Sequence, residues 1–302
     1  IQYFNQVINA KPYLYEPYFF RGLAKINLDD FQGAEADCNA AIQRNPFVVG
    51  AYQIRGLARI RQNNYDGAIE DYKTALKYDP ENLVLWHNLS LCHMQKEDYG
   101  AAKEDLGKLL KIAPRYTRAY LMRGEVSLKQ KDTIQALNDF EKAIEWLVSA
   151  GILNRIYNVS KMEHPLSAFD KLDQFKLFLF DTGLLKHMAG IDNSAILLKA
   201  DYQFKGPLTE NYVLQQLRGQ FAVEPRYYSD KNGEIDFVLQ HGMDIIPVET
   251  KGGEEKSAPS FKRYIAERHP QYAIRISKRG YRKDGAITNI PLYLVRKTKE
   301  LL

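Results

Sequence analysis

Cysteine, tryptophan and long apolar runs are all scarce in this chain of 302 residues. It contains two Cys and two Trp, and no apolar run reaches the roughly 18 residues that a membrane-spanning helix needs. Cys38 and Cys92 each lie in a helical pattern, which favours core packing over a disulfide and suits a reducing compartment. The first residues show no signal-peptide pattern. The sequence therefore predicts a cytoplasmic protein without disulfides and without a membrane partner.

Signatures of several enzyme classes are also missing. The chain has no G-x-x-x-x-G-K-[ST] motif, so no ATP site is predicted. Its six His show no zinc-ligand spacing, and no Ser/His/Asp or Cys/His set stands out. A zinc site and a nucleophilic triad are therefore not expected.

The net charge of +5 is unevenly distributed. Residues 1–146 contain 19 Lys and Arg against 19 Asp and Glu, whereas the remainder contains 23 against 18. Eight basic side chains and one acid, Glu267, fall within residues 262–283. Such a patch suits a polyanion, although a solvated helix face has the same pattern.

Four kinds of residue recur with a period of 34 in the first half of the chain. The columns are Pro12, Pro46, Pro80 and Pro114; Gly22, Gly56, Ser90 and Gly124; Tyr18, Tyr52, Trp86 and Tyr120; and Ala34, Ala68, Ala102 and Ala136. Small residues let paired helices approach closely, the aromatic fills the gap between units, and proline ends each unit. Over about 1–147 this pattern resembles the tetratricopeptide repeat, which implies an all-α solenoid with a concave groove.

The resemblance also implies that the first helix of each unit lines this groove and binds a peptide or protein. The inward positions hold Phe19, Leu23, Gln53, Leu57, Arg61, His87, Leu91, Gln95, Leu121, Glu125 and Lys129. The family's clamp for C-terminal carboxylates is matched only by Asn88, so recognition of a chaperone tail is not expected. A pure scaffold or oligomer contact is the alternative.

The segment GEIDFVLQHGMDIIPVETKGG, residues 233–253, predicts a β-hairpin that carries charge inside its strands. With a loop at His241–Asp244, Gln240 lies opposite Ile245, and the same register places Asp236 opposite Glu249. Glu234 then lies opposite Lys251. Because side chains alternate along a strand, this register predicts a charged face and a dry face. The dry face holds Ile235, Phe237, Leu239, Ile246 and Val248.

Two carboxylates that face each other repel unless a cation lies between them, and Mg²⁺ prefers such oxygen ligands. Lys251 would then orient or help to deprotonate an attacking water, or stabilise a developing negative charge. The residues alone predict a candidate metal site for phosphodiester chemistry at Asp236 and Glu249. A cluster of surface ion pairs is the alternative.

Asp236 followed by Glu249-Thr250-Lys251 resembles the core of the PD-(D/E)XK nuclease-like, or restriction-endonuclease-like, α/β fold. Glu210 stands where a preceding helix of that family often contributes another acid. The resemblance implies that Glu210, Asp236 and Glu249 bind Mg²⁺ or Mn²⁺, and that Asp236, Glu249 and Lys251 are catalytic. Phosphate contacts to DNA are expected from a basic loop, whose alternative role is to cap the sheet. The loop residues are Lys278, Arg279 and Arg282.

A longer pattern covers about 146–302 and is similar to the C-terminal domain of an uncharacterised prokaryotic AAA+-type ATPase family. It comprises FKLFLFDTGLL, LTENYVLQQL, GEIDFVL, IPVETK and RISKRGYRKDG. In that family an ATPase and a winged-helix module precede this domain. Here repeats take the place of the ATPase, and a short winged-helix remnant is predicted at 148–165. The predicted domains are therefore 1–147 and 148–302.

The chain begins at Ile1 rather than Met, and residues 1–14 have the pattern of a truncated repeat. These features predict a fragment or an engineered fusion, with a natural rearrangement or a gene-model error as alternatives. Two functions stay open. One is an interaction scaffold fused to a metal-dependent, nucleic-acid-binding nuclease-like domain, and the other is a non-catalytic interaction protein whose nuclease-like domain is inactive.

Overall fold

The computed structural model describes residues 1–191, 205–251 and 259–302. Its internal contacts divide the chain into two compact units, Ile1–Leu147 and Val148–Leu302. Each unit has its own clusters of buried apolar side chains.

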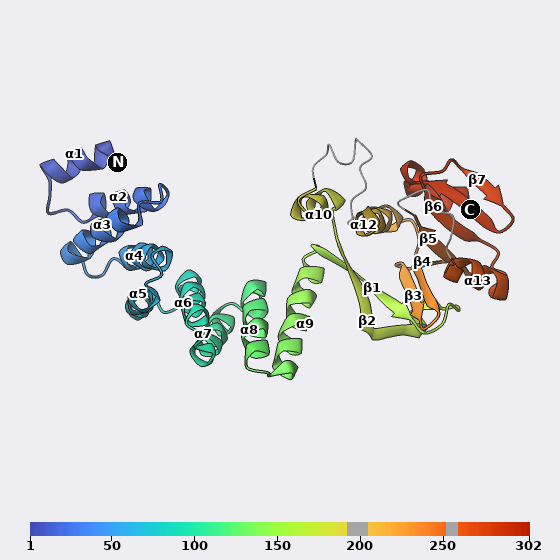
Figure 1. Ribbon diagram of the computed structural model, residues 1–302, viewed down its shortest axis with the longest axis horizontal. Coiled ribbons are helices and arrows are strands. Elements are labelled where there is room, and N and C mark those ends of the chain that lie inside the picture. Colours follow the sequence, from blue (N-terminus) through green and yellow to red (C-terminus); the bar gives the residue numbers. More distant parts are fainter. Residues whose placement is uncertain (192–204, 252–258) are drawn as a thin grey trace. The chain divides into compact units, whose positions relative to one another are not determined.

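The N-terminal unit is an all-α array of helical hairpins (Figure 1). The second helix of one hairpin also contacts the first helix of the next, as α3 contacts α4 and α5 contacts α6. The helices are α1 (Gln2–Ala10), α2 (Glu16–Ile26), α3 (Phe31–Arg44), α4 (Val49–Arg61), α5 (Tyr65–Tyr78), α6 (Leu83–Gln95), α7 (Tyr99–Ile112), α8 (Thr117–Lys129) and α9 (Thr133–Ser149). The helical solenoid expected from the repeat is confirmed.

The turn inside each hairpin repeats the same local chemistry. One residue takes a left-handed conformation, and the next caps the following helix through its side chain. The left-handed residues are Asp29, Asn63, Glu97 and Lys131, with φ between 57° and 62°. The caps are Asp30, Asn64, Asp98 and Asp132, which accept from backbone N–H groups three residues later. Each cap satisfies a donor that the first helical turn leaves without a partner.

The small-residue column marks where paired helices touch. A Cβ added at Gly124 would lie 2.5 Å from Cε1 of Phe140, and one added at Gly56 would lie 2.8 Å from Cζ of Tyr72. The aromatic column has a polar role as well. Nε1 of Trp86 donates to the Pro80 carbonyl over 2.8 Å, and the Tyr120 hydroxyl donates to the Pro114 carbonyl over 3.1 Å. These hydrogen bonds join the aromatic column to the proline column across the turn between units.

A buried ion pair recurs between the two helices of a hairpin. Arg21 binds Asp37, Arg55 binds Asp71, and Arg123 binds Asp139. Asp71 is 2% exposed, and Arg59 also reaches its Oδ2 over 3.0 Å. Burial opposes the charged form of Asp71 and raises its pKa, and this effect exceeds the lowering caused by Arg55 and Arg59.

The third hairpin departs from this pattern. Leu89 stands where the other hairpins have arginine, and it is buried. Asp105 is instead held by His93, whose Nδ1 lies 2.7 Å from Oδ2 of Asp105. In this hairpin leucine takes the arginine position, and the partner of the aspartate is His93, at the position that Lys25 and Arg59 hold in the first two hairpins.

The C-terminal unit is built on a mixed sheet with the strand order β2-β1-β3-β4-β5-β6-β8-β7. The strands are β1 (Leu153–Val159), β2 (Asp170–Leu179), β3 (Arg226–Asp230), β4 (Gly233–His241), β5 (Asp244–Thr250), β6 (Ala273–Ser277), β7 (Arg282–Asp284) and β8 (Ile287–Pro291). Segment 148–165, predicted as a winged-helix remnant, supplies β1, which pairs with β2 and β3.

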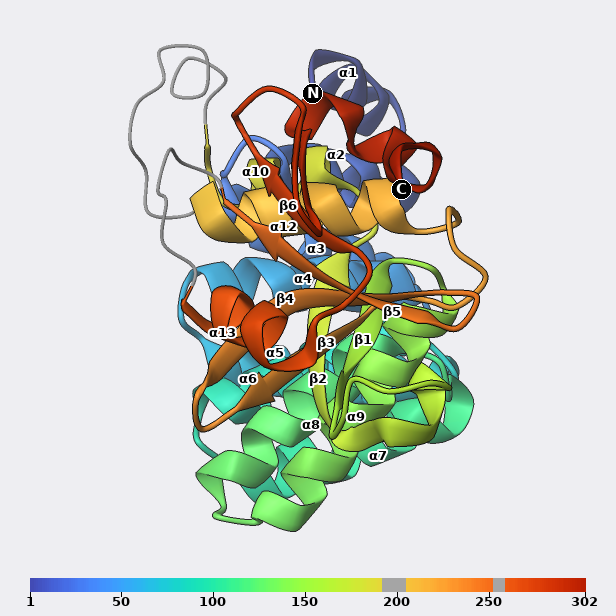
Figure 2. The same ribbon diagram turned by 90° about the vertical axis from the view of Figure 1, so that its right-hand side faces the viewer.

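Helices cover both faces of this sheet. The helices are α10 (Thr182–Met188), α12 (Lys205–Leu217) and α13 (Pro259–Arg268), with 3-10 turns η1 (Leu166–Phe169) and η2 (Leu292–Leu301). In Figure 2, α12 runs across the strands of the sheet. On this side Leu214 and Leu217 pack with Phe237 and Val248. On the other side Met162 and Leu166 pack with Ile235 and Val238, and Tyr264 of α13 joins them.

Candidate functional site

The predicted register of the hairpin β4–β5 is present in the structure. Gln240 pairs with Ile245, and Phe237 pairs with Val248. The expected four-residue loop is shorter, because His241 and Asp244 also pair and leave Gly242–Met243 as the turn. Gly242 has a φ of 60°, a conformation that glycine adopts without strain. The hairpin is therefore one pair longer than predicted.

Asp236 terminates the ladder between the two strands. Its Oδ2 accepts from the backbone N of Thr250 over 2.6 Å and from Oγ1 of the same residue over 2.7 Å. The Asp236 carboxylate thus accepts the Thr250 N–H at the point where backbone pairing between β4 and β5 ends. This contact holds the carboxylate in one position.

The predicted sorting of β4 into one dry face and one charged face is wrong. The pairing of β3 with β4 shifts by one residue between Arg226 and Tyr228, because β4 contains an extra residue there. Such a bulge reverses the alternation of side chains. Ile235 consequently packs with Val238, whereas Phe237 packs in the opposite core under α12.

The bulge also separates the two predicted carboxylates. Asp236 binds Thr250, which by alternation lies on the side of Val248 and α12. Glu249 has the opposite parity and is in register with Arg275 of β6. The two acids are still close enough to repel each other, but they do not share one face.

Glu249 and Lys251 form an ion pair at the end of β5. Nζ of Lys251 lies 2.7 Å from Oε1 of Glu249, and Glu249 is 5% exposed. The backbone N of Lys251 donates to the Ile276 carbonyl over 2.8 Å, which continues the parallel pairing to β6. Strand pairing therefore fixes the position of both residues.

Glu210 on α12 joins the same neighbourhood through a lysine that the sequence analysis missed. Nζ of Lys176, on β2, lies 3.8 Å from Oε2 of Glu210, and it also donates to Glu234. Its ammonium sits 5.0 Å from the centre of the Tyr227 ring. A lone lysine inside the otherwise apolar run FKLFLF was the available signal, because a buried lysine requires partners.

Burial and mutual repulsion shape the protonation of this cluster. Burial, followed by the charge of Asp236, raises the pKa of Glu249 to about 7 despite the neighbouring Lys251. The same two causes raise the pKa of Glu210, and burial raises the pKa of Asp236. Burial opposes the charged form of Lys176, but its hydrogen bond to Glu234 and the nearby acids outweigh this and raise its pKa. Burial, with repulsion from Asp236, therefore opposes ionisation of Glu210 and Glu249.

The three predicted metal ligands are not preassembled. Within residues 1–191, 205–251 and 259–302, no group of three or more His, Cys, Asp or Glu is arranged to hold a metal ion. Each predicted ligand already has a protein partner: Glu210 has Lys176, Asp236 has Thr250, and Glu249 has Lys251. The donor chemistry still suits Mg²⁺, which commonly uses only one or two carboxylates and retains several waters.

The basic loop between β6 and β7 is held in shape by Asn289. Its Nδ2 donates to the carbonyls of Arg279 and Gly280 over 3.1 and 2.8 Å, and the Ser277 hydroxyl accepts from the Arg279 backbone N. The side chains of Lys278, Arg279 and Arg282 are exposed. Arg279 and Arg282, together with Arg275, border a small cavity of about 170 Å³. The loop therefore presents several cations in a defined shape.

The predicted groove residues separate into exposed and packed groups. Exposed side chains are Leu23, Arg61, Gln95, Leu121, Glu125 and Lys129, while Phe19, Gln53, Leu57 and Leu91 are half-buried. Phe19 packs against the cluster that contains Tyr18 and Ala51, and Leu91 packs against the cluster that contains Met122. The positions accessible to a partner are therefore mainly polar or charged, with Leu23 and Leu121 as apolar exceptions.

His87 does not line an open groove, which corrects its assignment. It is 8% exposed, and its ring meets the Tyr116 ring edge-on at a centroid distance of 6.0 Å. Burial lowers its pKa, and the charge of Arg118 adds to this effect. Its neighbour Tyr116 lies in the turn before α8. The next hairpin therefore covers His87, although the 34-residue period predicted that this side chain faces the groove.

Comparisons with known protein families identify the helical unit. Models described as tetratricopeptide repeats match residues 19–82 and 59–126. Residues 19–126 of the N-terminal unit are tetratricopeptide repeats. A domain of unknown function, DUF4143, matches residues 205–295, and a second, DUF8612, matches 94–195. The tetratricopeptide repeats indicate a protein-interaction scaffold, while the C-terminal match carries no assigned function.

Solved structures similar to this chain include the crystal structure of MamA, at 20% identity and a TM-score of 0.48, covering 49% of this chain and 86% of that one. Another is MamA 41-end from Desulfovibrio magneticus RS-1, at 20% identity and a TM-score of 0.47, covering 49% and 84%. No curated protein matches the sequence. None of the helices in the described ranges is both long and apolar enough to cross a membrane.

Proposed function

We propose that this protein is a tetratricopeptide interaction scaffold that carries a metal-dependent, nuclease-like domain. The repeat array would bind a peptide or protein along its exposed polar positions, such as Arg61 and Glu125. The C-terminal unit would act on a phosphodiester of nucleic acid, with Asp236, Glu249 and Lys251 as its catalytic residues. Lys278, Arg279 and Arg282 would contact the phosphate backbone.

The observation that carries this proposal is the convergence of buried carboxylates and lysines where β4 and β5 end. Burial and repulsion from Asp236 raise the pKa of Glu249 to about 7, and a bound cation would relieve this repulsion. Lys251 is paired with Glu249 and could stabilise the charge that develops on the phosphate. To hold a divalent cation together, Glu210, Asp236 and Glu249 would have to leave their present partners and turn toward one another. The bound cation would then polarise the phosphodiester.

The first test is nicking of supercoiled plasmid DNA by the full chain with Mg²⁺ or Mn²⁺. Asp236→Ala should lower a metal-dependent rate by about a hundredfold or more, because the cation would lose a proposed ligand. Asp244→Ala is a matched control, because Asp244 lies at the other end of the same hairpin. Nicking that persists in Asp236→Ala, or that falls equally in both variants, would reject the site.

The lysines favour a second candidate, a non-catalytic interaction protein. Lys176 lies against Glu210 and Glu234, and Lys251 lies against Glu249, so ammonium groups already relieve part of the negative charge. Calorimetric titration with Mn²⁺ separates the two functions. Binding that Glu249→Gln removes supports the nuclease-like function. A folded wild-type protein that neither binds Mn²⁺ nor nicks DNA supports the second.

A further inference from the structure

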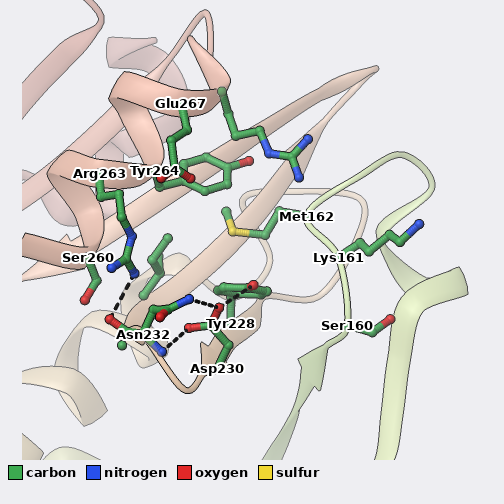
Figure 3. Close-up of a pocket in the computed structure, with 13 residues that line it drawn as sticks. Ser160, Lys161, Met162, Tyr228, Asp230, Asn232, Ser260, Arg263, Tyr264 and Glu267 are labelled. Carbon is green, nitrogen blue, oxygen red and sulfur yellow. Dashed lines mark hydrogen bonds between the residues drawn. The ribbon is translucent and has the colours of Figure 1, made fainter.

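A cavity of about 380 Å³ opens on the face of the sheet that carries α13 (Figure 3). Its walls come from the segment after β1, the end of β3, the turn into β4, and α13. The volume falls within the roughly 300–1,000 Å³ typical of small-ligand sites. None of Glu210, Asp236 or Glu249 lines it.

The interior of the cavity offers aromatic and apolar surfaces. Tyr228 of β3 and Tyr264 of α13 contribute rings, and both are half-buried. Met162 and Ile235, which are buried in the core on this side of the sheet, contribute apolar surface beside them. Such surfaces suit a planar, uncharged ring.

Two arginines of α13 make the opening cationic. The charge of Arg268 acts on the hydroxyls of both Tyr228 and Tyr264, against the rise in pKa that burial causes there. Arg263 donates from Nη2 to the Asn232 carbonyl over 2.9 Å, which fixes its guanidinium at the rim (Figure 3). A guanidinium placed in this way is well suited to a phosphate.

Two acids also border the opening, Asp230 and Glu267. Asp230 is already engaged, because it accepts from the Tyr228 hydroxyl over 3.1 Å and from the Asn232 backbone N over 2.8 Å. Glu267 is exposed on α13. Lys161 borders the opposite wall, but its ammonium lies 6.0 Å from the Phe169 ring and points away from the cavity in Figure 3.

We propose that this cavity binds a nucleotide, with the base against Tyr228 and Tyr264 and the phosphate at Arg263 and Arg268. Two sources share this chemistry, a free nucleoside monophosphate and the 5′-phosphorylated end of a strand. The site lies beyond the proposed nuclease-like function, since it shares no residue with the carboxylate cluster.

The test measures binding of adenosine monophosphate, inorganic phosphate, and a short oligonucleotide with or without a 5′-phosphate to the full chain by calorimetry. Arg268→Gln should weaken nucleotide binding about tenfold, and Tyr264→Leu should weaken it about ten- to hundredfold. Lys262→Gln, on the same helix but outside the cavity lining, should leave it unchanged. Thermal unfolding of each variant shows whether it is folded.

Each outcome decides something. Binding of the monophosphate supports the free ligand, and binding of the 5′-phosphorylated oligonucleotide alone supports the strand end. If inorganic phosphate binds as tightly as the monophosphate, the base contributes no affinity, and the proposal is overturned. Equal binding by Arg268→Gln and the wild type, or no binding of any probe, also overturns it. Asp236→Ala should keep full nucleotide binding, so this proposal and the nuclease-like function can fail separately.

Discussion

Replacing Arg55 by leucine should lower the free energy of unfolding of the repeat unit by about 3 kcal/mol, near the lower end of the range for breaking a buried ion pair. Nε of Arg55 lies 3.1 Å from both carboxylate oxygens of Asp71, which is 2% exposed. Leucine should fit, because Leu89 occupies the equivalent position in the third hairpin. The loss arises from leaving Asp71 with only Arg59 as its cationic partner.

Urea unfolding followed by tryptophan fluorescence measures this effect selectively. Trp86 and Trp146 are the two tryptophans of the chain, and both lie in the repeat unit. Arg61→Leu, on the same helix but exposed, is the control and should change the free energy by less than about 0.5 kcal/mol. Adding Asp71→Asn to Arg55→Leu should restore part of the loss. A single-variant effect below about 1 kcal/mol would show that Asp71 does not carry an uncompensated charge.

Replacing Glu249 by glutamine should stabilise the C-terminal unit at pH 8 and have little effect near pH 4.5. The folded state raises the pKa of Glu249 from 4.5 to about 7. Between these values the folded protein retains a proton that the unfolded chain has lost, so the free energy of unfolding falls as pH rises. Above pH 7 the full cost is present, which is about 3 kcal/mol at 1.36 kcal/mol per unit of pKa.

Glutamine has nearly the same shape as glutamate but no ionisable carboxyl group, so residue 249 no longer titrates in this variant. Urea unfolding at several pH values, followed by circular dichroism, reports both units, and tryptophan fluorescence separates the contribution of the repeats. Glu267→Gln, an exposed glutamate of α13, is the control and should follow the wild-type pH profile. A Glu249→Gln profile with the same fall between pH 4.5 and 7 would assign that titration to another group.

This pH dependence also bears on the proposed chemistry. A bound divalent cation would favour the charged form of Glu249 and should therefore stabilise the wild-type protein most at pH 8. The stabilisation should be lost in Glu249→Gln.

Much of the repeat unit followed from the sequence alone. A period of 34 in proline, glycine, aromatic and alanine columns is sufficient because each hairpin contacts only its neighbours, so local patterns dictate the packing. Gly56 against Tyr72 and Gly124 against Phe140 confirm the reason for the small-residue column. The hairpin register was also predictable, since a loop at His241–Asp244 places Phe237 opposite Val248.

Other features depended on contacts between residues that are distant in the chain. The bulge in β4 arises from its pairing with β3, and no residue type within β4 marks it, so the separation of Asp236 from Glu249 could not be predicted. Lys176 meets Glu210 and Glu234 only because β2 and α12 lie close together in the folded unit. His87 is covered by the next hairpin. Periodicity along the sequence therefore determined the elements and their local pairing, and tertiary packing decided which charged groups meet, because their meeting depends on distances that no local pattern encodes.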